Sequence, residues 1–100
     1  MRLYISGPIT GIENYRRIFQ GAKDALLAKG YDVVNPAELT EVIGDSFSYD
    51  EILAIDLDLL ARCDAVVQLP GWENSRGANV EYGYALAADK IIIKLEDILA

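Results

Sequence analysis

Residues 64–94, DAVVQLPGWENSRGANVEYGYALAADKIIIK, decide the fold class of this chain. The stretch opens with an apolar segment typical of a buried strand, Asp64–Leu69, and closes with a second strand at Lys90–Lys94. Between them, Ser75 is a good helix N-cap and predicts a helix that runs to about Ala88. A strand, a helix and a strand in this order predict two parallel strands joined by a right-handed crossover.

The residues before this stretch repeat the same alternation. We predict strands at Arg2–Ser6 and Tyr31–Val34 and helices at Asn14–Lys29 and Tyr49–Arg62, with a polar loop at 37–48. We also expect a loop between the strand that ends at residue 69 and the helix after it, and a helical turn at the end of the chain. The chain is therefore predicted as one α/β domain, residues 1–100, a three-layer sandwich around a parallel sheet of about four strands.

Composition and charge exclude several classes of function. With 52% apolar and 25% charged residues, the sequence is not typical of a disordered chain. It contains no His and only one Cys, which excludes a Cys/His zinc site and His-dependent nucleophilic catalysis. We expect neither a metal nor another cofactor. No apolar run approaches the length of a membrane span, and no signal peptide is recognisable, so we expect a cytoplasmic protein that does not enter a membrane.

The net charge of −7 argues against binding to a nucleic-acid polymer, which would be repelled. The whole excess lies between Glu38 and Asp64, because the rest of the chain is neutral in sum. Such a run usually forms a solvated helix face. Asp56 is the exception, since it falls near the centre of the apolar arc of the predicted helix 49–62. A buried carboxylate there is either bonded to loop N–H groups or part of a site.

Ligands of open parallel sheets bind beyond the carboxyl ends of the strands, so the loops placed there should carry the functional groups. The first of these loops begins at Ser6 and continues through Gly7, Pro8, Ile9 and Thr10. It is a glycine loop whose backbone N–H groups, with the hydroxyls of Ser6 and Thr10, suit binding of an anionic substrate. Ser75 and Gly77, with Arg76 between them, form a second helix start that favours an anion.

Glu81 lies three residues after Ala78 and four before Ala85, which places it near a packed helix face, although an exposed glutamate fits the same position. Glu81, Asp56 and the phenol of Tyr4 would then meet at one edge of the sheet. Two carboxyl groups suffice for glycosidic-bond chemistry, one as nucleophile or base and the other as acid.

In these features the chain resembles the nucleoside 2-deoxyribosyltransferase superfamily, and within it the small 2′-deoxynucleoside 5′-monophosphate N-glycosidases of phage and bacteria. The similarity extends over nearly the whole chain. Its motifs are Tyr4-Ile5-Ser6-Gly7-Pro8, Asn35-Pro36, Asp56-Leu57, Cys63-Asp64-Ala65-Val66-Val67 and Ser75-x-Gly77-x-x-x-Glu81-x-Gly83-x-Ala85.

The resemblance implies a flavodoxin-like or Rossmann-like fold, a homodimer or larger homo-oligomer, and a small-molecule nucleotide or nucleoside as substrate. It implies that Glu81 is a nucleophile forming a covalent glycosyl–enzyme intermediate, that Asp56 assists departure of the base, and that Tyr4 holds Glu81 in place. It leaves open a deoxyribosyltransferase that moves the sugar between bases, or a nucleotide-binding module without catalysis.

The resemblance also bears on the substrate. The transferases have an aspartate six residues before the nucleophile, whereas the monophosphate hydrolases have a serine there that binds the 5′-phosphate. This chain has Ser75, which favours hydrolysis of a monophosphate. It departs from the hydrolases at Pro8 and Thr10, where they carry a serine and an arginine.

The base pocket is less defined by the sequence. Asn35 offers a hydrogen-bonding side chain for a base edge, and Trp72 offers a stacking surface. Equally, Asn35 before Pro36 suits a turn, and Trp72 is suited to covering the core.

Overall fold

Four short parallel strands form the centre of the molecule: β1 (Arg2–Ser6), β2 (Asp32–Val34), β3 (Ala65–Gln68) and β4 (Ile91–Lys94). Their order in the sheet is β2-β1-β3-β4, and every neighbouring pair is parallel. This is the order of the first four strands of flavodoxin-like folds. The computed structural model describes all residues from Met1 to Ala100. The predicted parallel α/β architecture is confirmed.

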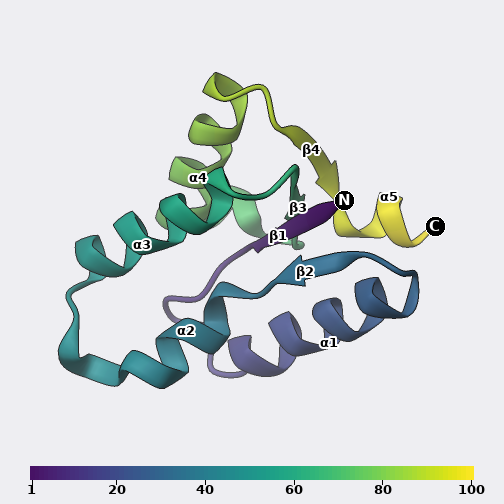
Figure 1. Cartoon of the computed structure of the whole chain (residues 1–100). Helices are drawn as coiled ribbons and strands as arrows, with labels where there is room; N and C mark the ends of the chain where they lie inside the picture. The colour runs from purple at the N-terminus through teal and green to yellow at the C-terminus, as the bar shows by residue number, and fades with distance from the viewer.

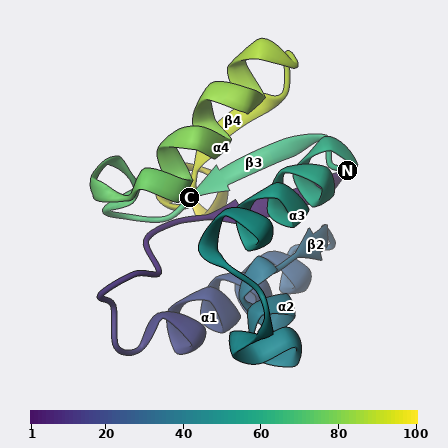
Figure 2. The same ribbon diagram turned by 90° about the vertical axis from the view of Figure 1, so that its left-hand side faces the viewer.

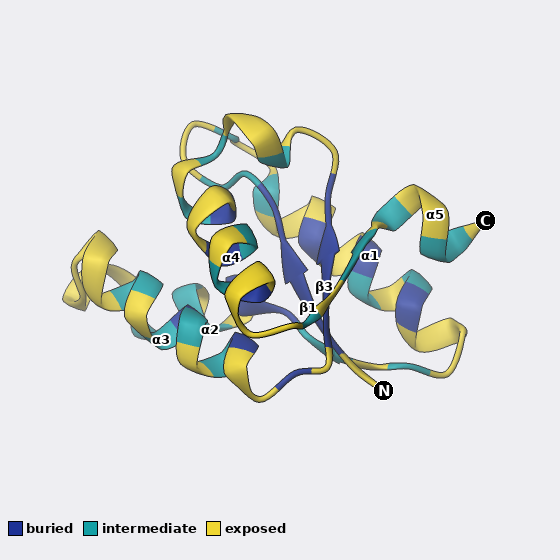
Figure 3. Ribbon diagram, turned by 90° about the horizontal axis from the view of Figure 1, so that it is seen from above, coloured by how far each residue is buried: buried dark blue, intermediate teal, exposed yellow.

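Helices cover both faces of this sheet (Figure 1). One face carries α1 (Tyr15–Ala28) and α5 (Leu95–Leu99), and the other carries α3 (Tyr49–Ala61) and α4 (Arg76–Ala87) (Figure 2 and Figure 3). Seen from above, the buried strands β1 and β3 lie between helices whose outer surfaces are exposed (Figure 3). These are the three layers that the sequence predicted, and none of the helices is long and apolar enough to cross a membrane.

Strand β1 sends alternate side chains to the two faces, as a strand must. Leu3 and Ile5 join Phe19 and Leu26 of α1 in the larger core cluster. Tyr4 points the other way and packs in a second cluster with Leu60. Ser6, two residues beyond Tyr4, therefore also faces the layer of α3 and α4.

The loop predicted at residues 37–48 is wrong, because the structure has helix α2 (Pro36–Ile43) followed by a 3₁₀ turn, Gly44–Ser46. The side chain of Asn35 caps α2 by accepting a hydrogen bond of 3.0 Å from the Ala37 N–H. Pro36 occupies the first helical position, where its missing N–H costs nothing. A second short 3₁₀ turn, Trp72–Asn74, lies in the loop predicted before α4.

Apart from Asp56, every acidic residue of the segment from Glu38 to Asp64 is exposed, as expected of a solvated surface. Helix α3 begins inside this segment with a capping box. The Ser48 hydroxyl accepts from the Glu51 N–H at 3.2 Å, and the Glu51 carboxylate accepts from the Ser48 N–H at 2.8 Å. Two of the exposed acidic residues, Asp50 and Glu51, lie in the first turn of α3, where negative charge stabilises the start of a helix.

The chain turns out of β1 at Gly7, where backbone and core approach closely. A Cβ atom on Gly7 would lie 2.8 Å from both Cβ and Cδ1 of Leu69, a side chain with 1% of its surface exposed. The Leu69 N–H donates to the carbonyl oxygen of Ser6 at 2.8 Å, so this approach is fixed by the sheet. Gly7 is required here for space.

We expect Gly7→Ala to destabilise the fold by about 1–3 kcal/mol, the usual cost of overpacking a core. Urea unfolding followed by circular dichroism measures the change. Gly21→Ala is the matched control, because Gly21 is exposed in α1 with no atom within 4 Å of the added Cβ. That substitution should stabilise the protein by up to about 1 kcal/mol through helix propensity. A Gly7→Ala variant as stable as the wild type would contradict this packing.

Candidate active site

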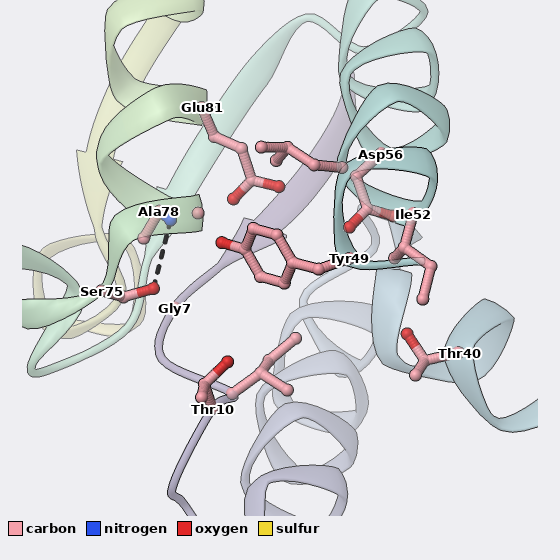
Figure 4. Close-up of a pocket in the computed structure, with 12 residues that line it drawn as sticks. Gly7, Thr10, Thr40, Tyr49, Ile52, Asp56, Ser75, Ala78 and Glu81 are labelled. Atoms are coloured by element: carbon pink, nitrogen blue, oxygen red, sulfur yellow. Dashed lines mark hydrogen bonds between the residues drawn. The ribbon is translucent and has the colours of Figure 1, made fainter. Parts of the chain in front are cut away.

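A cavity of about 290 Å³ lies between α3 and α4 at the carboxyl end of β1 (Figure 4). The chain leaves β1 between β2 on one side and β3 on the other, which is the switch point where ligands of such sheets bind. The loop after β1, helix α2 and the facing sides of α3 and α4 supply its walls. The lining residues are Gly7, Ile9, Thr10, Thr40, Tyr49, Ile52, Leu53, Asp56, Ser75, Gly77, Ala78 and Glu81.

Glu81 is a buried carboxylate on the wall formed by α4, with 6% of its surface exposed. The Tyr4 hydroxyl donates a hydrogen bond to its Oε2 atom, and the Ser6 hydroxyl donates to Oε1 at 2.6 Å. Both donors come from the same face of β1. Each carboxylate oxygen keeps a further lone pair. The two hydrogen bonds therefore fix the orientation of Glu81 and leave its oxygens able to make another bond.

Two opposing effects act on the pKa of Glu81. Burial raises this pKa above its usual range, while the hydrogen bonds from Ser6 and Tyr4 lower it by favouring the ionised form. The pKa of Tyr4 is raised well above its ordinary value by burial and by the negative charges of Glu81 and Asp56. The phenol therefore stays protonated and remains a hydrogen-bond donor to Glu81.

Asp56 faces the same space from α3, and Figure 4 shows both carboxyl groups pointing inward from opposite helices. Its side chain is 7% exposed, and its buried Oδ1 atom has no hydrogen-bond partner. The bonds from loop N–H groups that would make Asp56 purely structural do not reach this oxygen. Burial, and secondarily the charge of Glu81, raises the pKa of Asp56 to about 7. Asp56 is thus partly protonated at neutral pH and able to donate a proton.

The outer end of the cavity is the start of α4. The Ser75 hydroxyl caps this helix by accepting from the Ala78 N–H at 3.2 Å. The N–H groups of Arg76 and Gly77 belong to the first turn and have no intrahelical acceptor. They suit an anion placed against this helix end. The structure contains no cluster of three or more acidic or Cys side chains arranged for a metal ion.

Comparisons with known proteins give the family of this chain and structures that share its fold. Residues 1–94 match the family model DUF4406, described as a domain of unknown function. The chain belongs to the DUF4406 family. No curated protein sequence matches it.

Two solved structures share the fold of this DUF4406 chain. The 2-deoxyribosyltransferase from the psychrotolerant bacterium Bacillus psychrosaccharolyticus superposes with a TM-score of 0.74 at 17% identity, covering 94% of this chain and 71% of that one. The 2-desoxiribosyltransferase from Leishmania mexicana gives 0.65 at 24% identity, covering 93% of this chain and 62% of that one. The DUF4406 chain therefore has the fold of the 2-deoxyribosyltransferases, as the resemblance in its sequence predicted.

The DUF4406 structure distributes all but two of the residues predicted for the site over three places. The cavity between α3 and α4 is lined by Asp56 and Glu81 together with Gly7, Ile9, Thr10, Ser75 and Gly77. Tyr4 and Ser6 lie behind Glu81 as its hydrogen-bond donors, and Ser6 is 2% exposed. Pro8 and Arg76 line a neighbouring cavity.

Asn35 and Trp72 line neither cavity. The side-chain oxygen of Asn35 is used in capping α2. The Trp72 ring packs on Tyr82 with 4.9 Å between ring centroids. The structure thus gives both residues a local packing or capping role.

Five lining residues were not predicted as site residues: Thr40, Tyr49, Ile52, Leu53 and Ala78. Thr40 lies on α2, which was predicted as loop. Tyr49 and Ile52 precede Asp56 by seven and four residues and share its stripe on α3, the apolar arc of the predicted helix 49–62. The signal was present in that spacing, but a helical wheel does not separate a side chain that fills a core from one that lines a cavity.

The raised pKa of Asp56 predicts a pH-dependent stability. At pH 5 the folded protein holds a proton on Asp56 that the unfolded chain, with its ordinary pKa of 3.8, has mostly lost. The stabilisation of the folded state by this bound proton is lost as the pH rises through about 7. We expect the free energy of unfolding of the wild type, relative to Asp56→Asn, to fall by about 2 kcal/mol between pH 5 and pH 8.

Urea unfolding across this pH range measures the effect. Asp58→Asn is the matched control, because Asp58 is exposed on the same helix. The free energy of unfolding of this variant should vary with pH as that of the wild type does. Parallel pH profiles for the wild type and Asp56→Asn would show that Asp56 is ionised in the folded protein.

Proposed function

We propose that this chain is an N-glycosidase that hydrolyses the base–sugar bond of a (deoxy)nucleoside 5′-monophosphate. The observation that carries the proposal is the pairing, in one cavity, of Glu81 held by two hydroxyl donors with Asp56, whose pKa is raised to about 7. Two carboxyl groups with different hydrogen-bond partners, one held by two hydroxyl donors and one with an unpartnered oxygen, can supply a nucleophile and an acid.

In the first step a Glu81 oxygen attacks the anomeric carbon of the sugar, forming a carbon–oxygen bond. The carbon–nitrogen bond to the base breaks, its electron pair stays on the base, and Asp56 delivers the proton that neutralises it. In the second step the Asp56 carboxylate takes a proton from water. The resulting hydroxide attacks the anomeric carbon and releases Glu81, which restores both groups.

The distribution of charge supports one orientation of the substrate. Both acidic side chains, Asp56 and Glu81, project from the middle of their helices. The end of the cavity at Ser75 and Gly77 is the positive end of the α4 dipole, with Arg76 beside it. A 5′-phosphate is repelled by the carboxylates and favoured at the helix start. In the proposed orientation the sugar lies against Glu81 and the base against α3.

Transfer of the sugar to a second base is the alternative reaction, and the fold favours it as much as hydrolysis because the two similar structures are described as deoxyribosyltransferases. Ser75 favours hydrolysis of a phosphorylated substrate, as the resemblance implies. Incubation with a nucleotide and a second free base separates the two, since only the transferase forms a new base–sugar bond.

The proposal also covers the oligomeric state, the location and the cofactor requirement of the enzyme. The resemblance supports a homo-oligomer acting on a small nucleotide in the cytoplasm, without metal or cofactor. Light scattering during size-exclusion chromatography tests the oligomer. A nucleotide-binding module without catalysis would bind the monophosphate in calorimetry and release no free base.

We expect Glu81→Gln to abolish base release from a panel of nucleoside 5′-monophosphates, because an amide is a poor nucleophile. The loss should be at least about 10³-fold in kcat, within the range for groups acting directly in the transition state. Chromatography of the free base measures it. Glu96→Gln, on α5 across the sheet, is the matched control and should keep full activity. Base release by Glu81→Gln at the wild-type rate would overturn the covalent mechanism.

We expect Ser75→Asp to lower kcat/KM for a nucleoside 5′-monophosphate about tenfold or more, while leaving the unphosphorylated nucleoside less affected. Aspartate caps a helix as well as serine does, so α4 keeps its start and only the charge changes. Equal losses on both substrates would show that no phosphate lies at Ser75.

A further inference from the structure

A second cavity of about 720 Å³ adjoins the catalytic one at its outer end. Thr10, Tyr49 and Ser75 line both cavities and so form the wall between them. The second cavity continues past Pro8 and Asn74, and Arg76 is its one charged lining residue. A cationic space therefore begins where the proposed substrate ends with its phosphate.

Tyr49 is the only one of the three wall residues with a large side chain. It is the first residue of α3, directly after the Ser48 cap. Figure 4 shows its hydroxyl pointing toward the start of α4. A Cβ atom on Gly77 would lie 3.0 Å from that hydroxyl, so the ring extends across the outer end of the cavity to the opposite helix.

The ring is held from its outer side and is not part of the core. The Arg76 guanidinium lies over it, 5.2 Å from the ring centroid, and Arg76 lies 3.8 Å from the Asp50 carboxylate. Tyr49 is 44% exposed, and its hydroxyl makes no hydrogen bond within the chain. Packing of the core does not account for a tyrosine here, whereas separation of the two cavities does.

We propose that Tyr49 sets the length of the substrate at its 5′ end, admitting a nucleoside monophosphate and excluding a diphosphate. This rests on the proposed function, which places the first phosphate at Ser75. A second phosphate would extend outward into the space taken by the ring. Without the ring, it would enter the second cavity beside Arg76, a favourable partner for an anion.

The decisive experiment compares nucleoside mono- and diphosphates of one base on three proteins: the wild type, Tyr49→Ala and Tyr49→Phe. The wild type should prefer the monophosphate in kcat/KM. Tyr49→Ala should reduce that preference about tenfold or more, and Tyr49→Phe should retain it because the bulk of the ring is kept. Phe47→Ala is the matched control, since Phe47 is an exposed aromatic residue beside α3 that lines neither cavity.

Calorimetry with the same two nucleotides separates this proposal from the proposed function. If no protein releases base but Tyr49→Ala gains affinity for the diphosphate relative to the monophosphate, the glycosidase proposal fails and the role of Tyr49 stands. If base is released but the ratio is the same in Tyr49→Ala and the wild type, Tyr49 does not set substrate length. A loss of preference in Tyr49→Phe equal to that in Tyr49→Ala would assign the discrimination to the hydroxyl and overturn the steric account.

Discussion

The hydrogen bonds from Tyr4 and Ser6 to Glu81 are the interaction on which the site depends. A carboxylate buried without partners costs several kcal/mol, and here two hydroxyl groups of one strand offset that cost. Their positions require β1 to alternate strictly, with Leu3 and Ile5 in the core on the other face. Strand β1, one of the two central strands of the sheet, thus holds the proposed nucleophile as well as part of the core.

Helix α4 is built to allow this contact. The residues flanking Glu81 on its inner face, Ala78 and Ala85, are small and buried, so the helix lies close to the sheet. Gly77 at its start leaves room for the Tyr49 hydroxyl. Small side chains place the carboxylate within reach of β1 and leave the volume that the cavity occupies. The two proposed catalytic groups then differ through their partners, since Glu81 has two donors and the buried oxygen of Asp56 has none.

Much of this arrangement follows from the sequence, because the relevant signals are local. Strand and helix periodicity predicted the parallel sheet, and residue spacing alone placed Asp56 on the apolar face of its helix. Helix α2 was missed because Asn35-Pro36 is equally a turn signal and a helix start, and only the capping bond to Ala37 separates the two. Ser6 was predicted to bind substrate from its loop context, whereas its hydroxyl lies on the Tyr4 face of β1. Tyr49 belongs to the apolar arc of the predicted helix 49–62, but its place in the cavity wall was missed, since local spacing gives the face of a helix and not what lies opposite.

The raised pKa of Asp56 also changes what the charge of the chain means. The formal value of −7 and the isoelectric point of about 4.4 treat every carboxyl group as independent and solvated. In the folded protein Asp56 is still protonated at pH values where the unfolded chain has lost that proton, and Glu81 shifts in the same direction. Through these two groups folding takes up protons in mildly acidic solution, so at those pH values they carry less negative charge in the native protein than in its denatured chain. On an electrophoretic gel at such a pH, the two states would separate by charge as well as by size.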